Sequence, residues 1–66
     1  MTRIKLHRDI YSKEAIVKAI SDYKGIAKIR LQEKDSGYVL TFTLCKYGEE
    51  RTVKEFENYL IGLENR

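Results

Sequence analysis

Apolar and polar residues alternate at the start of the chain. Ile4 and Leu6 share one side of residues 2–7. The other side carries the basic residues Arg3, Lys5 and His7. Because successive side chains of a strand point to opposite faces, this period of two predicts a half-buried β-strand over residues 2–7. The apolar side is expected to face a core, and the basic side is expected to face solvent.

The period changes to that of an α-helix in the next segment. Ser12 is suited to cap a helix, because its hydroxyl accepts a hydrogen bond from an unpaired backbone N–H. The apolar residues that follow fall within one arc of a helical wheel: Ala15, Ile16, Ala19, Ile20 and Tyr23. Gly25 is expected to end the helix in the left-handed conformation. The pattern therefore predicts an amphipathic helix between Ser12 and Gly25.

Alternation returns twice in the middle of the chain, over residues 26–33 and 38–45. Residues 34–37 between them, Lys34, Asp35, Ser36 and Gly37, are assigned to a turn, so the two segments are expected to form a hairpin. The apolar positions predicted to face the helices in these strands are Ala27, Ile29, Leu31, Leu40, Phe42 and Leu44. Cys45 then falls on the solvent side.

A second helix is predicted after Gly48. Thr52 and Glu55 have the spacing of a capping box, which indicates a start near residues 49–53. The inward stripe of this helix comprises Val53, Phe56, Tyr59, Leu60 and Leu63.

The expected order of elements is β-α-β-β-α within a single domain, residues 1–66. A right-handed crossover places both helices on one face of a three-stranded sheet. The predicted fold class is therefore α+β, a two-layer sandwich. We favour the strand order one-three-two, as in a truncated ferredoxin-like fold that lacks its last strand. That order leaves one edge of the first strand open to an extended peptide or a second copy.

Composition adds a charge asymmetry to this picture. The net charge is +3, from 13 Lys/Arg and 10 Asp/Glu. Residues 1–34 hold nine of the basic residues and four of the acidic ones. One cysteine excludes an internal disulfide and fits the cytoplasm, and no apolar run is long enough to cross a membrane. We therefore expect a cytoplasmic protein with a polarised surface.

Candidate catalytic chemistry is sparse. His7 and Cys45 are the only residues of their kinds, and they are expected near opposite ends of neighbouring strands. The four glycines are isolated, so no phosphate-binding loop is formed, and no ligand spacing indicates a metal site. The expectation is a protein without catalytic residues, metal or cofactor.

Binding is the better supported class of function. The first hypothesis places a peptide or protein partner on the edge of the first strand, at Arg3, Lys5 and His7. The alternative is a nucleic-acid face on the sheet, formed by Lys28, Arg30, Thr41 and Thr43. Single-stranded RNA readers stack bases on exposed aromatic residues, and Phe42 lies in the apolar register, so nucleic acid is the less favoured partner. A structural homo-oligomer, such as a homodimer, is the third alternative.

Several segments carry a family resemblance. They are the run over residues 10–16, Lys18-Ala19, the strand over residues 27–31, Tyr38-Val39 and the helical run over residues 55–60. Together they resemble HxsD, the small protein of the His-Xaa-Ser system, whose genes accompany radical SAM proteins thought to modify a ribosomally made peptide. The resemblance implies an accessory role that transfers no catalytic residue. The implied partner is a radical SAM maturase or its substrate peptide.

Overall fold

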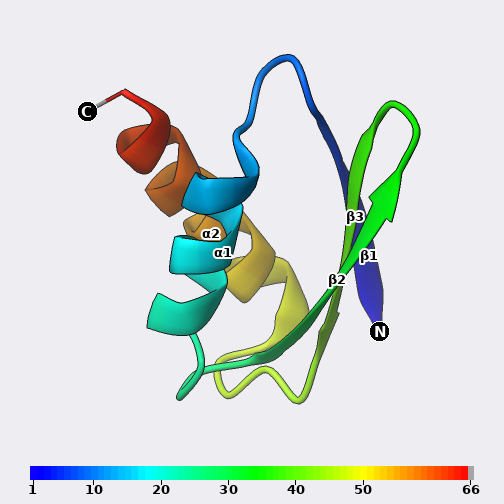
Figure 1. Cartoon of the computed structure of the whole chain (residues 1–66). Coiled ribbons are helices and arrows are strands. Elements are labelled where there is room, and N and C mark those ends of the chain that lie inside the picture. The colour runs from blue at the N-terminus through cyan, green and yellow to red at the C-terminus, as the bar shows by residue number, and fades with distance from the viewer. Residues whose placement is uncertain (66) are drawn as a thin grey trace.

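The computed structural model describes residues 1–65 and has the predicted order of elements. Its sheet contains β1 (Thr2–His7), β2 (Lys28–Lys34) and β3 (Gly37–Thr43). The helices are α1 (Lys13–Asp22) and α2 (Glu49–Glu64). Both helices lie on the same face of the sheet, and no element of the described residues covers the other face (Figure 1). The predicted two-layer α+β sandwich is confirmed.

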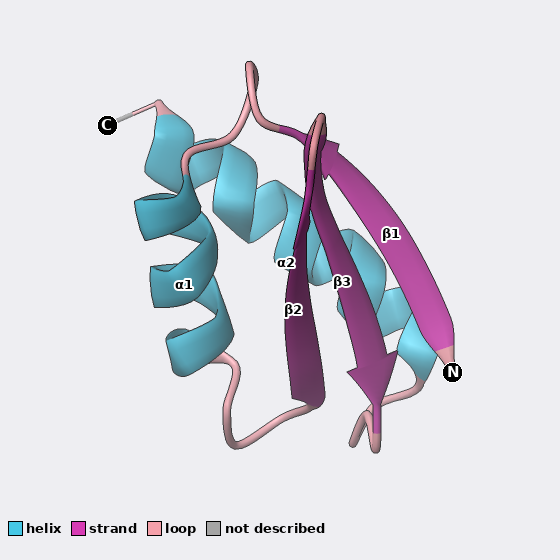
Figure 2. Ribbon diagram, turned by 45° about the vertical axis from the view of Figure 1, so that its right-hand side comes forward, coloured by secondary structure: helices cyan, strands magenta, loops and turns pink. Residues whose placement is uncertain are grey.

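The sheet order is β1-β3-β2, and both pairings are antiparallel. The favoured order one-three-two is therefore correct. β3 lies between the other two strands, while β1 and β2 are the edges of the sheet (Figure 2). This order of elements and strands corresponds to a ferredoxin-like fold without its last strand.

An aromatic cluster forms the centre of the core. Phe42 of β3 and Phe56 of α2 are both fully buried and meet edge to face, with ring centroids 5.2 Å apart. Tyr23 packs on the other side of Phe56 at 5.3 Å. Ile16 and Leu60, also fully buried, complete the contact between the helices and the sheet. The core therefore joins α2 to both α1 and the central strand.

The start of α1 is held by two caps. The Ser12 hydroxyl accepts from the Ala15 amide at 3.2 Å, as predicted. The Ser12 amide and hydroxyl in turn donate to Glu64 Oε1 at 2.8 and 2.7 Å. These two hydrogen bonds, from the amide and then from the hydroxyl, hold the pKa of the Glu64 carboxyl below its ordinary value. The last turn of α2 is thereby fastened to the first turn of α1.

The end of α1 and the cap of α2 differ from the sequence prediction. α1 ends at Asp22, and the amides of Ile26 and Ala27 bond to the Tyr23 carbonyl, so the chain turns without a left-handed Gly25. α2 begins at Glu49, which places Thr52 inside the helix and buries it. The predicted capping box is therefore wrong.

The end of β3 also departs from the expected alternation. Leu44 has a φ of 52°, in the left-handed region that leucine rarely adopts, and its side chain is 82% exposed. The prediction that Leu44 faces the helices is wrong, because this backbone conformation reverses the chain one residue beyond the strand. Cys45 lies half-buried against the core, where we expected solvent.

Candidate partner-binding edge and basic sheet face

The backbone groups of β1 divide between β3 and the outer edge of the sheet. Hydrogen-bonded pairs alternate along antiparallel strands. The Arg8 amide donates to the Ser36 carbonyl at 3.2 Å, and this pair continues the register of β1 on β3. Even-numbered residues of β1 therefore bond to β3, and odd-numbered residues direct their N–H and C=O groups to the outer edge. The His7 carbonyl accepts from Ile10 and Tyr11.

Arg3 and Lys5 are consequently the residues whose backbone groups point outward. Within residues 1–65 no strand pairs with this side of β1. Their side chains lie on the helix-free face of the sheet, because Ile4 and Leu6 face the helices. The strand order confirms the predicted position of the first strand at an edge of the sheet. Arg3 and Lys5 present their backbone groups at this edge and their positive charges on the adjoining face.

The register brings the two predicted sets of binding residues onto a single face. Thr41 pairs with both Arg3 and Arg30, so these three residues form one row across the sheet. Thr43 pairs with Lys28 in the row below. A hollow of about 250 Å³ is lined by all five of these side chains together with Met1 and Gln32. The predicted binding edge and the predicted nucleic-acid face are therefore continuous.

A second hollow, of about 420 Å³, lies around Gly37 near the hairpin. His7 and Lys34 pair with Gly37 from its two sides, and Lys5 also lines the hollow. Lys34 was missed as a site residue because we assigned it to the turn. The structure has a loop of only two residues, Asp35 and Ser36, and β2 continues to Lys34. A shorter turn would have placed Lys34 in the alternating pattern of the strand.

Charge is segregated between the two layers. Five Lys/Arg lie on the helix-free face: Arg3, Lys5, Lys28, Arg30 and Lys34. The ten Asp/Glu of the chain all lie on the helices, on the turns or, at Glu33, on the helix side of β2. Among residues 1–65 none of the five cations makes an ion pair. The face is therefore a positive surface without internal compensation.

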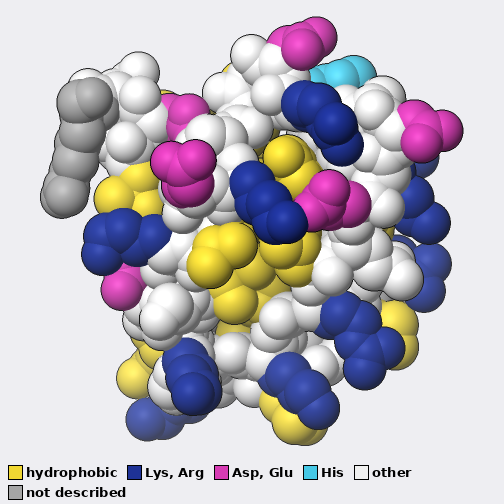
Figure 3. Space-filling view, viewed as in Figure 1, with side chains coloured by type: hydrophobic (Ala, Val, Ile, Leu, Met, Phe, Trp, Pro, Cys, Tyr) yellow, Lys and Arg dark blue, Asp and Glu magenta, His cyan; other side chains and the backbone are white. Residues whose placement is uncertain are grey.

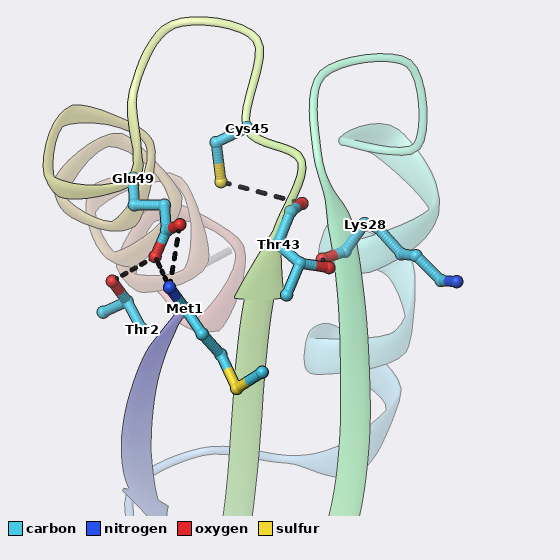
Figure 4. Close-up of polar contacts among 6 residues, drawn as sticks. All are labelled: Met1, Thr2, Lys28, Thr43, Cys45 and Glu49. Atoms are coloured by element: carbon cyan, nitrogen blue, oxygen red, sulfur yellow. Dashed lines mark hydrogen bonds and ion pairs between the residues drawn. The ribbon is translucent and has the colours of Figure 1, made fainter.

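The beginning of β1 is tied to the beginning of α2 (Figure 4). The Thr2 hydroxyl donates to Glu49 Oε1 at 2.6 Å, and the N-terminal ammonium of Met1 donates to Oε2 at 3.0 Å. The Thr2 hydrogen bond and then the ammonium hold the pKa of the Glu49 carboxyl below its ordinary value. At the other end of the strand, the Arg8 guanidinium donates to the Lys34 carbonyl at 3.0 Å. Both ends of the edge strand are thus held in place.

The residues considered for catalysis are separated. His7 pairs with Gly37 at one end of β3, whereas Cys45 follows Thr43 at the other end. The Cys45 thiol lies 3.9 Å from the Thr43 carbonyl oxygen. No group of three or more His, Cys, Asp or Glu side chains is placed to hold a metal ion within residues 1–65. Nor does any described helix have the length and apolar character needed to span a membrane.

Comparisons with protein-family models, curated proteins and solved structures gave no match. The resemblance to HxsD stays a prediction. The basis for assigning a function is therefore the geometry of the sheet.

Proposed function

We propose that the protein binds an extended segment of a partner protein, which adds as a fourth strand to the outer edge of β1. The observation that supports this most is the arrangement at Arg3 and Lys5. Their outward backbone groups and their basic side chains can contact the same ligand strand. Affinity comes from main-chain hydrogen bonds, and the side chains select the sequence. A ligand residue opposite Arg3 or Lys5 projects onto the helix-free face, so acidic residues at alternate positions are preferred.

A second copy of the chain is a poorer occupant of this edge. Pairing β1 with β1 would place Arg3, Lys5 and His7 beside the same residues of the other copy on one face. Like charges at neighbouring positions of paired strands are destabilising. The charge on the edge therefore favours an acidic partner over a homodimer. In the cassette implied by the HxsD resemblance, such a partner is the maturase or its substrate peptide.

The test uses a synthetic seven-residue peptide that alternates Glu and Thr. Titration into ¹⁵N-labelled protein should shift the amides of Arg3 and Lys5 and slow their hydrogen exchange. Lys5→Pro removes an outward N–H without breaking a bond to β3, so it should abolish binding while the fold persists. Lys5→Ala should weaken binding about three- to tenfold, because the backbone contacts remain. Lys54→Ala removes the same charge from α2 and should have no effect.

The proposal fails if binding survives Lys5→Pro while amide shifts remain confined to other strands. A matched peptide that alternates Lys and Thr should not bind. If both peptides bind equally, selection by the basic edge is wrong.

A second candidate function is favoured by the hollow on the helix-free face. Arg3, Lys28 and Arg30 surround the Thr41 and Thr43 hydroxyls there, as donors that suit the phosphates of a single-stranded nucleic acid. Binding of a thymidine oligonucleotide should then weaken steeply with added salt, and Lys28→Ala with Arg30→Ala should reduce the salt dependence. Lys54→Ala again serves as the control. No salt dependence, or an equal effect of the control, would exclude this candidate.

A further inference from the structure

The second edge of the sheet is β2, and its outward backbone groups differ in surroundings from those of β1. Because even-numbered residues of β3 bond to β1, its odd-numbered residues bond to β2. Their partners in β2 have even numbers, so Ile29 and Leu31 direct their backbone groups away from the sheet. Within residues 1–65 no strand pairs with this edge. Here, in contrast to β1, the outward backbone groups belong to residues whose side chains lie on the helix side.

An apolar groove adjoins this edge. It has a volume of about 630 Å³ and lies between the second half of α1, the loop before β2 and the start of β2. Val17 and Ile20 of α1 line one wall, and Ile29 lines the other. Figure 3 shows hydrophobic side chains gathered at the surface between α1 and β2. The groove is accessible because α1 packs on α2 through residues such as Tyr23, which leaves Val17 48% exposed.

Leu44 also lines the groove. It combines a left-handed backbone, which is unfavourable for leucine, with a side chain that is 82% exposed. Strained residues persist where the surrounding structure holds them, and they cluster at ligand-binding positions. Leu44 is thus an independent sign, outside α1 and β2, that this corner receives an apolar ligand.

The charges around the groove specify the ligand further. Lys24, Lys28 and Lys46 line it, and among residues 1–65 no Asp or Glu does. A ligand strand beside β2 would place apolar residues opposite Ile29 and Leu31, pointing to the groove, and its intervening residues beside Lys28 and Arg30. A second copy of β2 would bring like charges together at those intervening positions.

We infer that the α1–β2 groove is a second docking site, which takes an extended partner segment with alternating apolar and acidic residues. The segment adds to the edge of β2 and inserts its apolar side chains between Val17, Ile29 and Leu44. This docking site lies at the edge formed by β2, and the site proposed above lies at the opposite edge, formed by β1, so the two sites are independent. The two edges differ in ligand chemistry, since the inward residues of the ligand must be apolar only at β2.

The test titrates ¹⁵N-labelled full-length protein with a synthetic peptide that alternates Glu and Leu. The amides of Ile29 and Leu31 should shift and exchange more slowly on binding. A control peptide of the same composition, with its Glu and Leu residues in two blocks, should bind at least tenfold more weakly. Amide shifts confined to β1, equal affinity for both peptides, or no binding at millimolar peptide would overturn the inference.

Two variants test the contribution of the groove to binding without disrupting the fold. Val17→Glu places a good helix former at an exposed position, and it should weaken binding at least tenfold because the apolar side chains of the ligand would bury a carboxylate. Leu44→Asn should weaken binding severalfold yet raise the melting temperature, because asparagine tolerates the left-handed conformation. Lys5→Pro, on the other edge, should leave the affinity unchanged. Unchanged affinity in both groove variants, or a loss with Lys5→Pro equal to that with Val17→Glu, would refute the site.

Discussion

Phe56→Ala should leave the protein largely unfolded at room temperature. Phe56 is fully buried and contacts both Phe42 and Tyr23 edge to face, so its removal opens a cavity at the junction of the two helices and the sheet. Truncation of a buried phenylalanine costs about 3–5 kcal/mol. A single core in a chain of this length rarely supplies more than about 3–5 kcal/mol of stability. The expected loss therefore equals the whole stability.

Far-UV circular dichroism during urea denaturation measures this effect. The expected result for Phe56→Ala is a loss of helical signal before urea is added. Tyr47→Ala is the matched control, because Tyr47 is also aromatic but is 56% exposed. Its stability should change by no more than about 0.5 kcal/mol. A cooperative Phe56→Ala transition near the wild-type midpoint would contradict the assignment of this ring to the centre of the core.

Gly37→Ala is expected to have the second largest effect. A Cβ atom at this position would lie 2.1 Å from the Leu6 carbonyl oxygen and 3.1 Å from the Arg8 amide nitrogen. Both neighbours are backbone atoms of the β1 region, so relief of the clash requires the strands to separate. Forced overpacking of this kind costs about 1–3 kcal/mol. The displaced strand is also the proposed binding edge, so affinity for the Glu-Thr peptide should fall with stability.

Gly62→Ala is the same substitution at another position, and we expect it to raise the stability of the protein. A Cβ atom at Gly62 meets nothing within 4 Å, and the residue lies inside α2. Alanine is favoured over glycine in a helix by about 1 kcal/mol, so this variant should be more stable than the wild type. Urea midpoints of the two variants should shift in opposite directions. Shifts in the same direction would show that backbone contact at Gly37 does not set the spacing between β1 and β3.

Elements that depend on local pattern were predictable from the sequence. The strand over residues 2–7 and the Ser12 cap are confirmed, since each rests on side chains within one turn or one strand. The end of β3 was not predictable in the same way. Leucine at position 44 continues the apolar alternation, and nothing in its residue type signals a positive φ. The predicted capping box failed for a similar reason, because the spacing of Thr52 and Glu55 fits the inside of a helix as well as its start.

The candidate binding surfaces also differ in how far they could be predicted from local sequence pattern. The basic face follows from alternation, and the free edge of β1 follows from strand order, so both could be derived before the structure. The groove between α1 and β2 depends on how α1 packs against α2. Val17 and Leu44 look like ordinary apolar residues in the sequence, and only tertiary packing leaves them at one surface.

The separation of charge between the two layers gives the molecule an electric dipole moment directed across its thickness. An approaching polyanion therefore experiences a torque as well as an attraction, and this torque turns the sheet toward it at distances up to about one Debye length. An encounter with such an anion would then begin with the strands already facing it.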